Sequence, residues 1–123
     1  MKKIISLVVF GTFFSCVNYE CNCTDFKTGT FEFTKEINGK KQTSRFTRTQ
    51  NLQIETFEGK TDTASVRWIN DCEFILNNRH PKNREEKKAI SIRIISTEKN
   101  TYTFEYGYVG DEKKEIGIVT KID

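Results

Sequence analysis

The sequence predicts an all-β fold: a single antiparallel meander of about eight strands, closed into a small barrel or curled into a half-barrel. Apolar and polar residues alternate with a period of two through most of the chain, which is typical of strands with one buried face. Turn signals separate these segments, and the chain has one proline, so little interrupts a continuous sheet. Closure is favoured because it removes the unpaired edges of an open sheet.

Eight segments carry the alternation. Phe31 and Phe33 lie on one face of the first segment, and Asn38 with Gly39 then predicts a hairpin, because a type I′ turn requires positive φ at both central residues. The predicted strands are 30–37, 41–49, a third marked by Leu52 and Ile54, 63–69, 73–76, a sixth marked by Ile90, Ile92 and Ile94, a seventh marked by Tyr102, Phe104, Tyr106 and Tyr108, and a last marked by Ile116, Ile118 and Ile122.

Residues 77–88, NNRHPKNREEKK, interrupt the alternation. Pro81 is suited to the first position of a helix, so one short helix is predicted from there to about Lys88. The charges of this segment are mixed, and its simplest interpretation is a solvated crossover loop. A loop that binds a partner is the alternative.

The N-terminus has the features of an export signal. Two lysines precede residues 4–14, a mostly apolar stretch that is shorter than the roughly 20 residues a membrane-spanning helix needs. An ordinary cleavage site is poor, because phenylalanines occupy places where small residues are required. Residues 13–16, FFSC, resemble the lipobox of bacterial lipoproteins, in which the signal is cut before a cysteine that becomes acylated. The departures are Phe13, where leucine is commonest, and Phe14, where a small residue is usual.

This resemblance implies a signal peptide over 1–15, lipidation of Cys16, a tether over 16–24 and a single β domain over 25–123. The membrane is then the first partner, because two or three acyl chains anchor a protein stably. The residue after Cys16 is not Asp, an inner-membrane retention signal in some bacteria, so the expected location is the outer membrane, facing the periplasm. A buried N-terminal strand or helix, and a soluble secreted protein, are the alternatives.

Two function classes receive no support from the sequence. The chain has 20 Lys and Arg against 17 Asp and Glu, and loss of two lysines with the signal lowers the excess from three to one, so nucleic-acid binding is not expected. The single histidine, His80, lies in the polar loop, and the acidic neighbours Asp71 and Glu73 disfavour a reactive thiolate at Cys72. We therefore expect neither an enzyme nor a cofactor.

Three cysteines besides Cys16 would lie in an oxidising compartment, where pairing is expected. A bond between Cys21 and Cys23 closes a strained ring, so we expect Cys72 to pair with one of them. Cys23 is the choice because it adjoins the first predicted strand, and Cys21 is then a free thiol or the partner in an alternative bridge. A zinc site that adds His80 to these cysteines is disfavoured, because C-x-C is shorter than the usual spacing of zinc ligands, and no metal is predicted.

Aromatic residues are abundant for a domain of this size, and most are expected in the core. Tyr102, Tyr106 and Tyr108 are the exception, since three phenols on one strand face need polar partners if they are buried. With Trp68 they are the candidate ligand-binding residues. Residues 27–33, KTGTFEF, resemble the opening strand of lipocalin-like barrels, where G-x-W begins the strand and phenylalanine stands here for tryptophan. That resemblance implies a cavity for a small apolar ligand.

Residues 67–74, RWINDCEF, and 23–31, CTDFKTGTF, resemble a family of small uncharacterised bacterial envelope lipoproteins. The family brings no established activity. Some relatives carry a DNA topoisomerase IV label, which a short exported chain without an ATP-binding motif does not support. The leading hypothesis is an envelope module for structure or protein interaction, with another envelope protein as its partner. The alternative is a carrier or sensor of a small amphipathic ligand with a lipocalin-like cavity.

Overall fold

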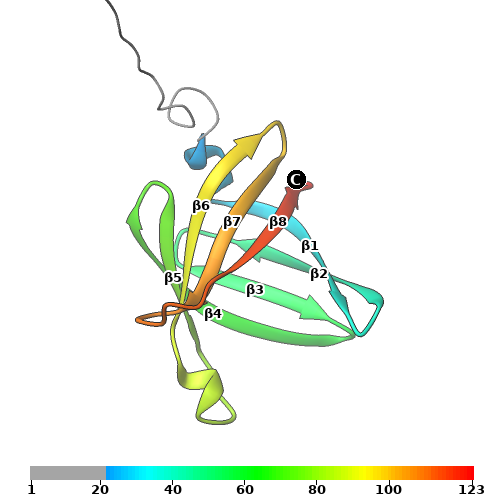
Figure 1. Cartoon of the computed structure of the whole chain (residues 1–123), viewed down its shortest axis with the longest axis vertical. Coiled ribbons are helices and arrows are strands. Elements are labelled where there is room, and N and C mark those ends of the chain that lie inside the picture. The colour runs from blue at the N-terminus through cyan, green and yellow to red at the C-terminus, as the bar shows by residue number, and fades with distance from the viewer. Residues whose placement is uncertain (1–21) are drawn as a thin grey trace, which may run out of the picture.

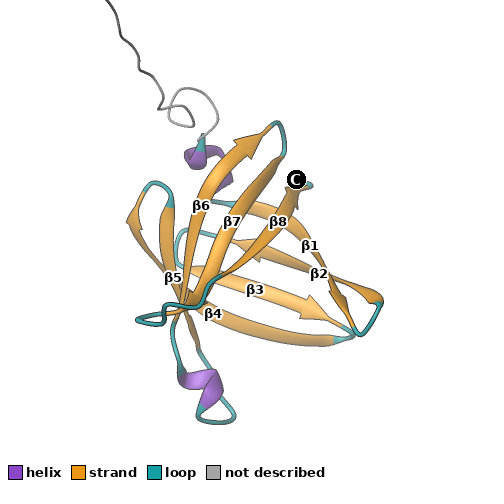
Figure 2. Cartoon of the chain, in the orientation of Figure 1, coloured by secondary structure: helices purple, strands orange, loops and turns teal. Residues whose placement is uncertain are grey.

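The computed structural model describes residues 22–123, whose eight strands form one closed antiparallel barrel (Figures 1 and 2). Each strand pairs with the next along the chain, and β8 pairs with β1. The strands are β1 (Gly29–Ile37), β2 (Lys40–Arg48), β3 (Leu52–Phe57), β4 (Lys60–Asn70), β5 (Glu73–Asn78), β6 (Ile90–Glu98), β7 (Thr101–Tyr108) and β8 (Glu115–Lys121). The predicted all-β meander is confirmed, and the barrel is the form it takes.

Two hairpins follow directly from local sequence. Asn38 and Gly39 join β1 to β2 with φ values of 53° and 80°, and Glu58 and Gly59 join β3 to β4 with φ values of 51° and 79°. Left-handed backbone at both central residues is the geometry of a type I′ turn. Because the meander alternates direction, these hairpins share one end of the barrel with the β5–β6 and β7–β8 connections. We call this end the mouth and the opposite end the base.

The base is closed by η3 (Cys23–Phe26), a 3-10 helix against the end of β6 (Figure 1). Cys23 and Phe26 are each 2% exposed, so this helix belongs to the core, whereas the sequence predicts Cys23 and Thr24 as the end of the tether. The core is rich in inward-facing aromatic and aliphatic side chains. Its barrel members are Phe31, Phe46, Val66, Phe74, Leu76, Ile92, Ile94, Tyr102, Phe104 and Val119.

The last strand faces the opposite way from the one its isoleucines suggest. Ile116 and Ile118 are 58% and 60% exposed, whereas Gly117 and Val119 are buried. A Cβ atom on Gly117 would lie 2.7 Å from the ring of Phe104. The inner side of β8 is therefore already filled by aromatic rings, and the larger side chains of this strand point outward.

On β3, too, the residues that point inward are not the apolar ones that the sequence pattern suggests. Gln53 and Glu55 lie opposite Arg48 and Phe46 of β2 and share their inward face, while Ile54 is 38% exposed. The register with β2 fixes this phase, because directly paired residues lie on the same face of a sheet. The polar side of β3 consequently lines the interior.

The closure between β1 and β8 is short. Residues 31–33 of β1 pair with residues 119–121 of β8. Nearer the mouth the two strands no longer pair with each other: residues 34–37 pair only with β2, and residues 115–118 pair only with β7. The β1–β2 hairpin diverges from β8 in Figure 1. An ion pair of 3.9 Å between Lys35 and Glu115 bridges the two strands there. The barrel is thus tight at its base and looser at its mouth.

The helix predicted in the 77–88 loop is reduced to a single turn, η4 (Glu85–Lys87). Asn83 Oδ1 accepts the backbone N–H of Glu86 at 2.8 Å, and the Glu86 carboxylate accepts the backbone N–H of Lys82 at 2.8 Å. This reciprocal pair starts the turn after Pro81 and not at it.

The predicted signal peptide, Cys16 and Cys21 lie outside the residues that the structure describes. Within residues 22–123, no helix has the length and apolar character needed to cross a membrane. The lipid anchor therefore remains a prediction from sequence.

Candidate functional site

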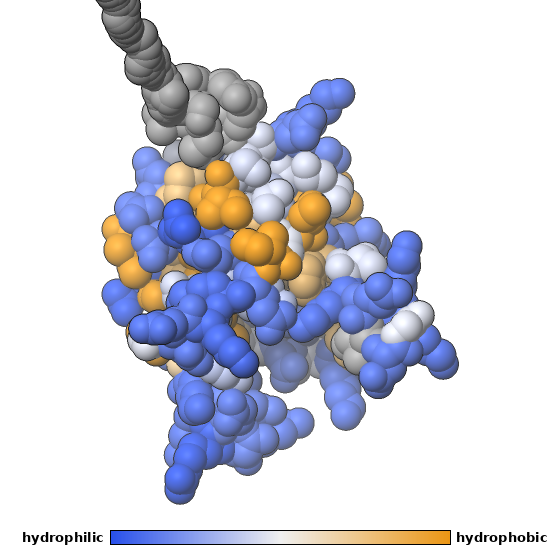
Figure 3. Space-filling view, in the orientation of Figure 1, coloured by the Kyte–Doolittle hydropathy of each residue, from blue (hydrophilic) through white to orange (hydrophobic). Residues whose placement is uncertain are grey.

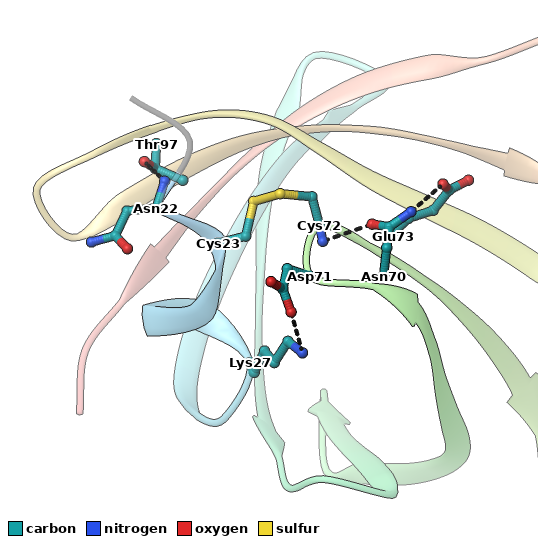
Figure 4. The surroundings of a disulfide bond; sticks show 8 residues. All are labelled: Asn22, Cys23, Lys27, Asn70, Asp71, Cys72, Glu73 and Thr97. Carbon is teal, nitrogen blue, oxygen red and sulfur yellow. Dashed lines mark hydrogen bonds and ion pairs between the residues drawn. A yellow bond between two sulfur atoms is a disulfide. The ribbon is translucent and has the colours of Figure 1, made fainter. Parts of the chain in front are cut away.

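A disulfide between Cys23 and Cys72 joins η3 to the turn between β4 and β5 (Figure 4). The predicted pairing is confirmed. Two polar contacts support it: Lys27 Nζ lies 3.1 Å from Asp71 Oδ1, and the backbone N–H of Asn22 donates to a threonine hydroxyl of β6 at 2.9 Å. One covalent and two polar links thus fix η3 as the floor of the barrel.

Arg48, the last residue of β2, lies on this floor and is 1% exposed. Its Nε donates to the carbonyl oxygen of Lys27 at 3.1 Å, and its Nη2 donates to the carbonyl oxygen of Phe26. The guanidinium also donates from Nη1 to Gln53 Oε1 at 3.0 Å and from Nη2 to the Tyr102 hydroxyl at 3.3 Å. One buried side chain therefore connects η3, β2, β3 and β7.

Aromatic rings surround the Arg48 guanidinium. The distances from its Cζ atom to the ring centroids are 4.6 Å for Phe31, 5.6 Å for Phe46, 5.8 Å for Trp68, 4.6 Å for Phe74 and 5.9 Å for Tyr102. Ring faces attract a guanidinium electrostatically. Arg48 has no carboxylate partner among the ion pairs of residues 22–123. The positive charge is therefore held by rings and neutral acceptors alone.

Above this floor the barrel lumen holds a cavity of about 180 Å³. Its lining is polar at Arg48, Gln53 and Glu55. The remaining lining residues are Phe33, Phe46, Leu76, Ile90, Ile92, Tyr102, Phe104, Tyr106 and Val119. The cavity is large enough for several water molecules, since each needs about 10–15 Å³ of free volume. An apolar surface with a few convergent polar groups is the usual lining of a small-molecule site.

Two further cavities lie at the mouth. One of about 250 Å³ shares Gln53, Glu55 and Ile90 with the lumen cavity and reaches Tyr108. The other, of about 440 Å³, lies beside Tyr106 and the β7–β8 connection, which contributes cationic side chains. Ile90 lines all three cavities. Shared lining residues place the lumen next to both mouth cavities.

The three candidate tyrosines occupy different depths. Burial raises the pKa of Tyr102 above its ordinary value of 10.0, and the adjacent guanidinium partly offsets this increase. Tyr106 is half-buried, and its hydroxyl donates to Glu115 Oε1 at 3.2 Å. Tyr108 lies at the mouth, where a hydrogen bond to Glu85 raises the pKa of its phenol. Only Tyr102 and Tyr106 line the lumen cavity.

Trp68 lies behind the floor, away from the lumen lining. Its ring packs against Phe74 with centroids 4.4 Å apart, and Lys27 Nζ lies 4.8 Å above it. Its Nε1 is the one buried side-chain nitrogen or oxygen without a hydrogen-bond partner in the described part of the chain. The predicted set is therefore split: Tyr102 and Tyr106 meet in the lumen, and Trp68 does not join them.

Sequence reasoning missed the polar side of the lumen. Arg48 follows Phe46 by two positions, and this spacing alone places its side chain on the inward face of the same strand. Gln53 and Glu55 had no such signal, because Leu52 and Ile54 made the opposite face of β3 look like the buried one. Only the pairing register with β2 reveals them.

The residues considered for a zinc site have other places in the part of the chain that the structure describes. Cys23 and Cys72 are bonded to each other, so they are not thiolate ligands for zinc. His80 is exposed in the β5–β6 connection. No cluster of three or more His, Cys, Asp or Glu side chains suited to a metal occurs in this range.

Comparisons with known proteins assign no family to the chain. No family model, curated protein or solved structure matches it. The resemblances to lipoproteins and to lipocalin-like barrels therefore remain predictions from sequence.

Proposed function

We propose that this chain is a lipid-anchored binding protein of the bacterial envelope, and that its lumen takes up one small amphipathic molecule. The observation that carries this proposal is the inward face of β3: Gln53 and Glu55 face the lumen, while Ile54 is partly exposed. Both polar side chains are half-buried, and Gln53 accepts a hydrogen bond from Arg48, so this wall can offer polar groups to a ligand without leaving them all unpartnered. A polar wall facing an apolar one fits a molecule with the same two sides.

The dimensions limit the ligand. The lumen cavity of about 180 Å³ is smaller than the roughly 300–1,000 Å³ of sites that hold drug-sized molecules. The adjoining mouth cavity of about 250 Å³ allows a longer ligand to extend towards solvent. We infer a compact apolar body in the lumen and a polar end either at Gln53 or at the mouth.

Obstructing the lumen tests this function. Ile90 lines the lumen and both mouth cavities, so Ile90→Phe should block entry and lower uptake of small amphipathic probes by at least about tenfold, a change of about 1.4 kcal/mol. Ile118→Phe is the matched control, since this side chain points outward and is 60% exposed. Binding is followed by calorimetry, and by native mass spectrometry of protein isolated from an envelope. Equal binding by both variants would contradict uptake through the mouth.

The anchor is tested separately. The lipobox-like FFSC at residues 13–16 supports acylation of Cys16 and outer-membrane attachment on the periplasmic side. Metabolic labelling with a palmitate analogue should label the wild-type chain and not the Cys16→Ser variant. After fractionation, the wild-type chain should be found with the membrane and the Cys16→Ser variant in the soluble periplasm. An unlabelled wild-type chain would remove the anchor and leave the lumen proposal intact.

A second candidate function, an interaction module of the envelope, is favoured by the outer surface of β8. Ile116 and Ile118 are exposed on residues 115–118 of β8, which pair with β7 and have no strand partner on the β1 side. Apolar side chains gather over β6 to β8 in Figure 3. An edge of this kind accepts an added strand from another protein, with alternate side chains on the isoleucines. Lys113 and Lys114 precede it, so we expect the incoming segment to be acidic at one end.

Photocrosslinking distinguishes this candidate. A photoreactive residue at position 118 should capture one identified envelope protein through an extended segment, whereas one at position 54 on β3 serves as the control. Ile116→Lys should abolish the crosslink without unfolding the barrel, because this side chain is 58% exposed. The same products at both positions would dismiss strand addition at β8.

A further inference from the structure

Building on the proposed lumen function, we propose that the ligand is a small carboxylate whose anionic group is held at the floor by Arg48 and Tyr102. Three features of the lumen support a carboxylate: the buried charge of Arg48 without a counter-ion, two unused hydrogen-bond donors and the position of Glu55. A lumen that binds neutral molecules equally well would lack this selectivity and still be a binding site.

The first feature is the charge. Arg48 is 1% exposed and has no ion-pair partner in residues 22–123. A buried cation without a counter-ion loses its hydration and gains no full opposite charge in return. Aromatic rings and neutral carbonyls stabilise it only in part. An anion entering the lumen supplies the charge that the fold omits.

The second feature is donor capacity. A guanidinium carries five N–H groups, and Arg48 makes four hydrogen bonds, with one from Nε, one from Nη1 and two from Nη2. One Nη1 hydrogen is therefore unused. Tyr102 accepts from Arg48 through its oxygen at 3.3 Å, and its own O–H hydrogen has no acceptor among the hydrogen bonds of the described residues. Both side chains line the lumen cavity, so two donors are available to one carboxylate.

The third feature is selection against other charges. Glu55 lies opposite Phe46 on β3, one inward position nearer the mouth than Gln53, and it lines the same cavity. As a diagonal neighbour of Arg48 it makes no ion pair with it within 4.0 Å. A second anionic group on the ligand would meet this carboxylate. The site therefore favours one carboxylate on an apolar body.

Cations at the mouth offer the competing explanation for carboxylate binding. Lys113 and Lys114 are exposed beside the mouth cavity of about 440 Å³. Attraction to exposed lysines weakens as salt is added, whereas a buried pair is screened much less. Ionic strength and a Lys114→Gln variant therefore separate the mouth from the floor.

The experiment compares benzoate with benzamide, two probes of similar shape that differ in charge. Calorimetry on the wild-type chain should show benzoate binding at least about tenfold more tightly, as expected for charge-assisted hydrogen bonds. Arg48→Gln should remove this preference, and Tyr102→Phe should weaken benzoate about threefold to tenfold. Glu55→Gln should strengthen benzoate several-fold, because it removes a nearby like charge. Lys114→Gln and added salt should change little.

Each result of this experiment either supports carboxylate binding at the floor or overturns it. Binding of both probes with equal affinity, unchanged in Tyr102→Phe and Glu55→Gln, overturns the carboxylate inference while lumen binding stands. A benzoate preference lost on adding salt or in Lys114→Gln also overturns it, in favour of the mouth. Failure of both probes to bind overturns this inference and removes support from the lumen function. If Arg48→Gln does not fold, the opposite signs expected for Tyr102→Phe and Glu55→Gln decide the question alone.

Discussion

The base and the mouth of this barrel are built by different means. At the base, a disulfide, a 3-10 helix and a caged arginine close the fold, and the largest fully buried side chains are Arg48, Phe31, Phe74 and Val119. At the mouth, Tyr106 and Tyr108 are only half-buried, and the β1–β8 closure has ended. Packing and covalent links thus concentrate at one end, and access to the interior at the other. Stability and binding should respond to substitutions at different ends.

The largest difference should come from removing a buried ring. Phe74 is 0% exposed and packs on Trp68 and on the Arg48 guanidinium, so Phe74→Ala should cost about 3–5 kcal/mol of unfolding free energy. Phe57 is half-buried at the mouth end of β3, so Phe57→Ala is the matched control and should lower the unfolding free energy by less than half as much. Urea denaturation measures both. Equal losses would mean that the mouth contributes to the core as much as the base does.

Removing the disulfide should have the next largest effect on stability. The bond between Cys23 and Cys72 spans a sequence separation of 49, and restriction of the unfolded chain by a loop of this size stabilises the fold by about 4 kcal/mol. The double variant Cys23→Ser, Cys72→Ser should lose this amount, and reductant should then have no further effect. Hydrogen exchange should accelerate at η3 and at the base ends of the strands before it does at the β7–β8 connection. Uniform acceleration would argue against a base that is secured locally.

A smaller effect should depend on pH and on Tyr102. Burial raises the pKa of Tyr102 above 10.0, so the neutral phenol is favoured more strongly in the folded than in the unfolded chain. Its contribution is fully present below pH 10.0 and is lost as the pH rises from there through the folded pKa. Urea denaturation across this window should show a steeper loss for the wild type than for Tyr102→Phe. Parallel curves would place the hydroxyl outside the core.

The fold was more predictable from sequence than the site. Period-two alternation locates strands, and Asn38-Gly39 specifies a hairpin, because both signals act within a few residues. The inward faces of β3 and β8 could not be predicted locally, since their outward isoleucines resemble a core pattern and only the pairing register with β2 and β7 decides which residues point inward. The lumen depends on those two strands. Its polar wall was therefore beyond local reasoning.

Arg48 shows the same limit at the level of one residue. Its spacing from Phe46 places it inward, yet an arginine at the end of a strand is ordinarily solvated, and nothing local reveals the rings that enclose it. Those rings come from β1, β2, β4, β5 and β7. Closure of the barrel assembles them. The disulfide was easier to predict, because three cysteines in the oxidising compartment expected from the sequence allow few pairings.

The smallest effect belongs to the mouth and should leave stability unchanged. The hydrogen bond between Tyr108 and Glu85 raises the pKa of that phenol, and removing the carboxylate in Glu85→Gln should return it towards 10.0. Nuclear magnetic resonance of ring-labelled tyrosine resolves Tyr108 from the other tyrosines, and Tyr108→Phe provides the assignment. Urea denaturation of Glu85→Gln should match the wild type, because interactions of exposed groups contribute little to folding. A pKa change with little change in stability at neutral pH would show that this exposed pair at the mouth is only weakly coupled to folding, whereas the Tyr102 phenol at the base should be coupled more strongly.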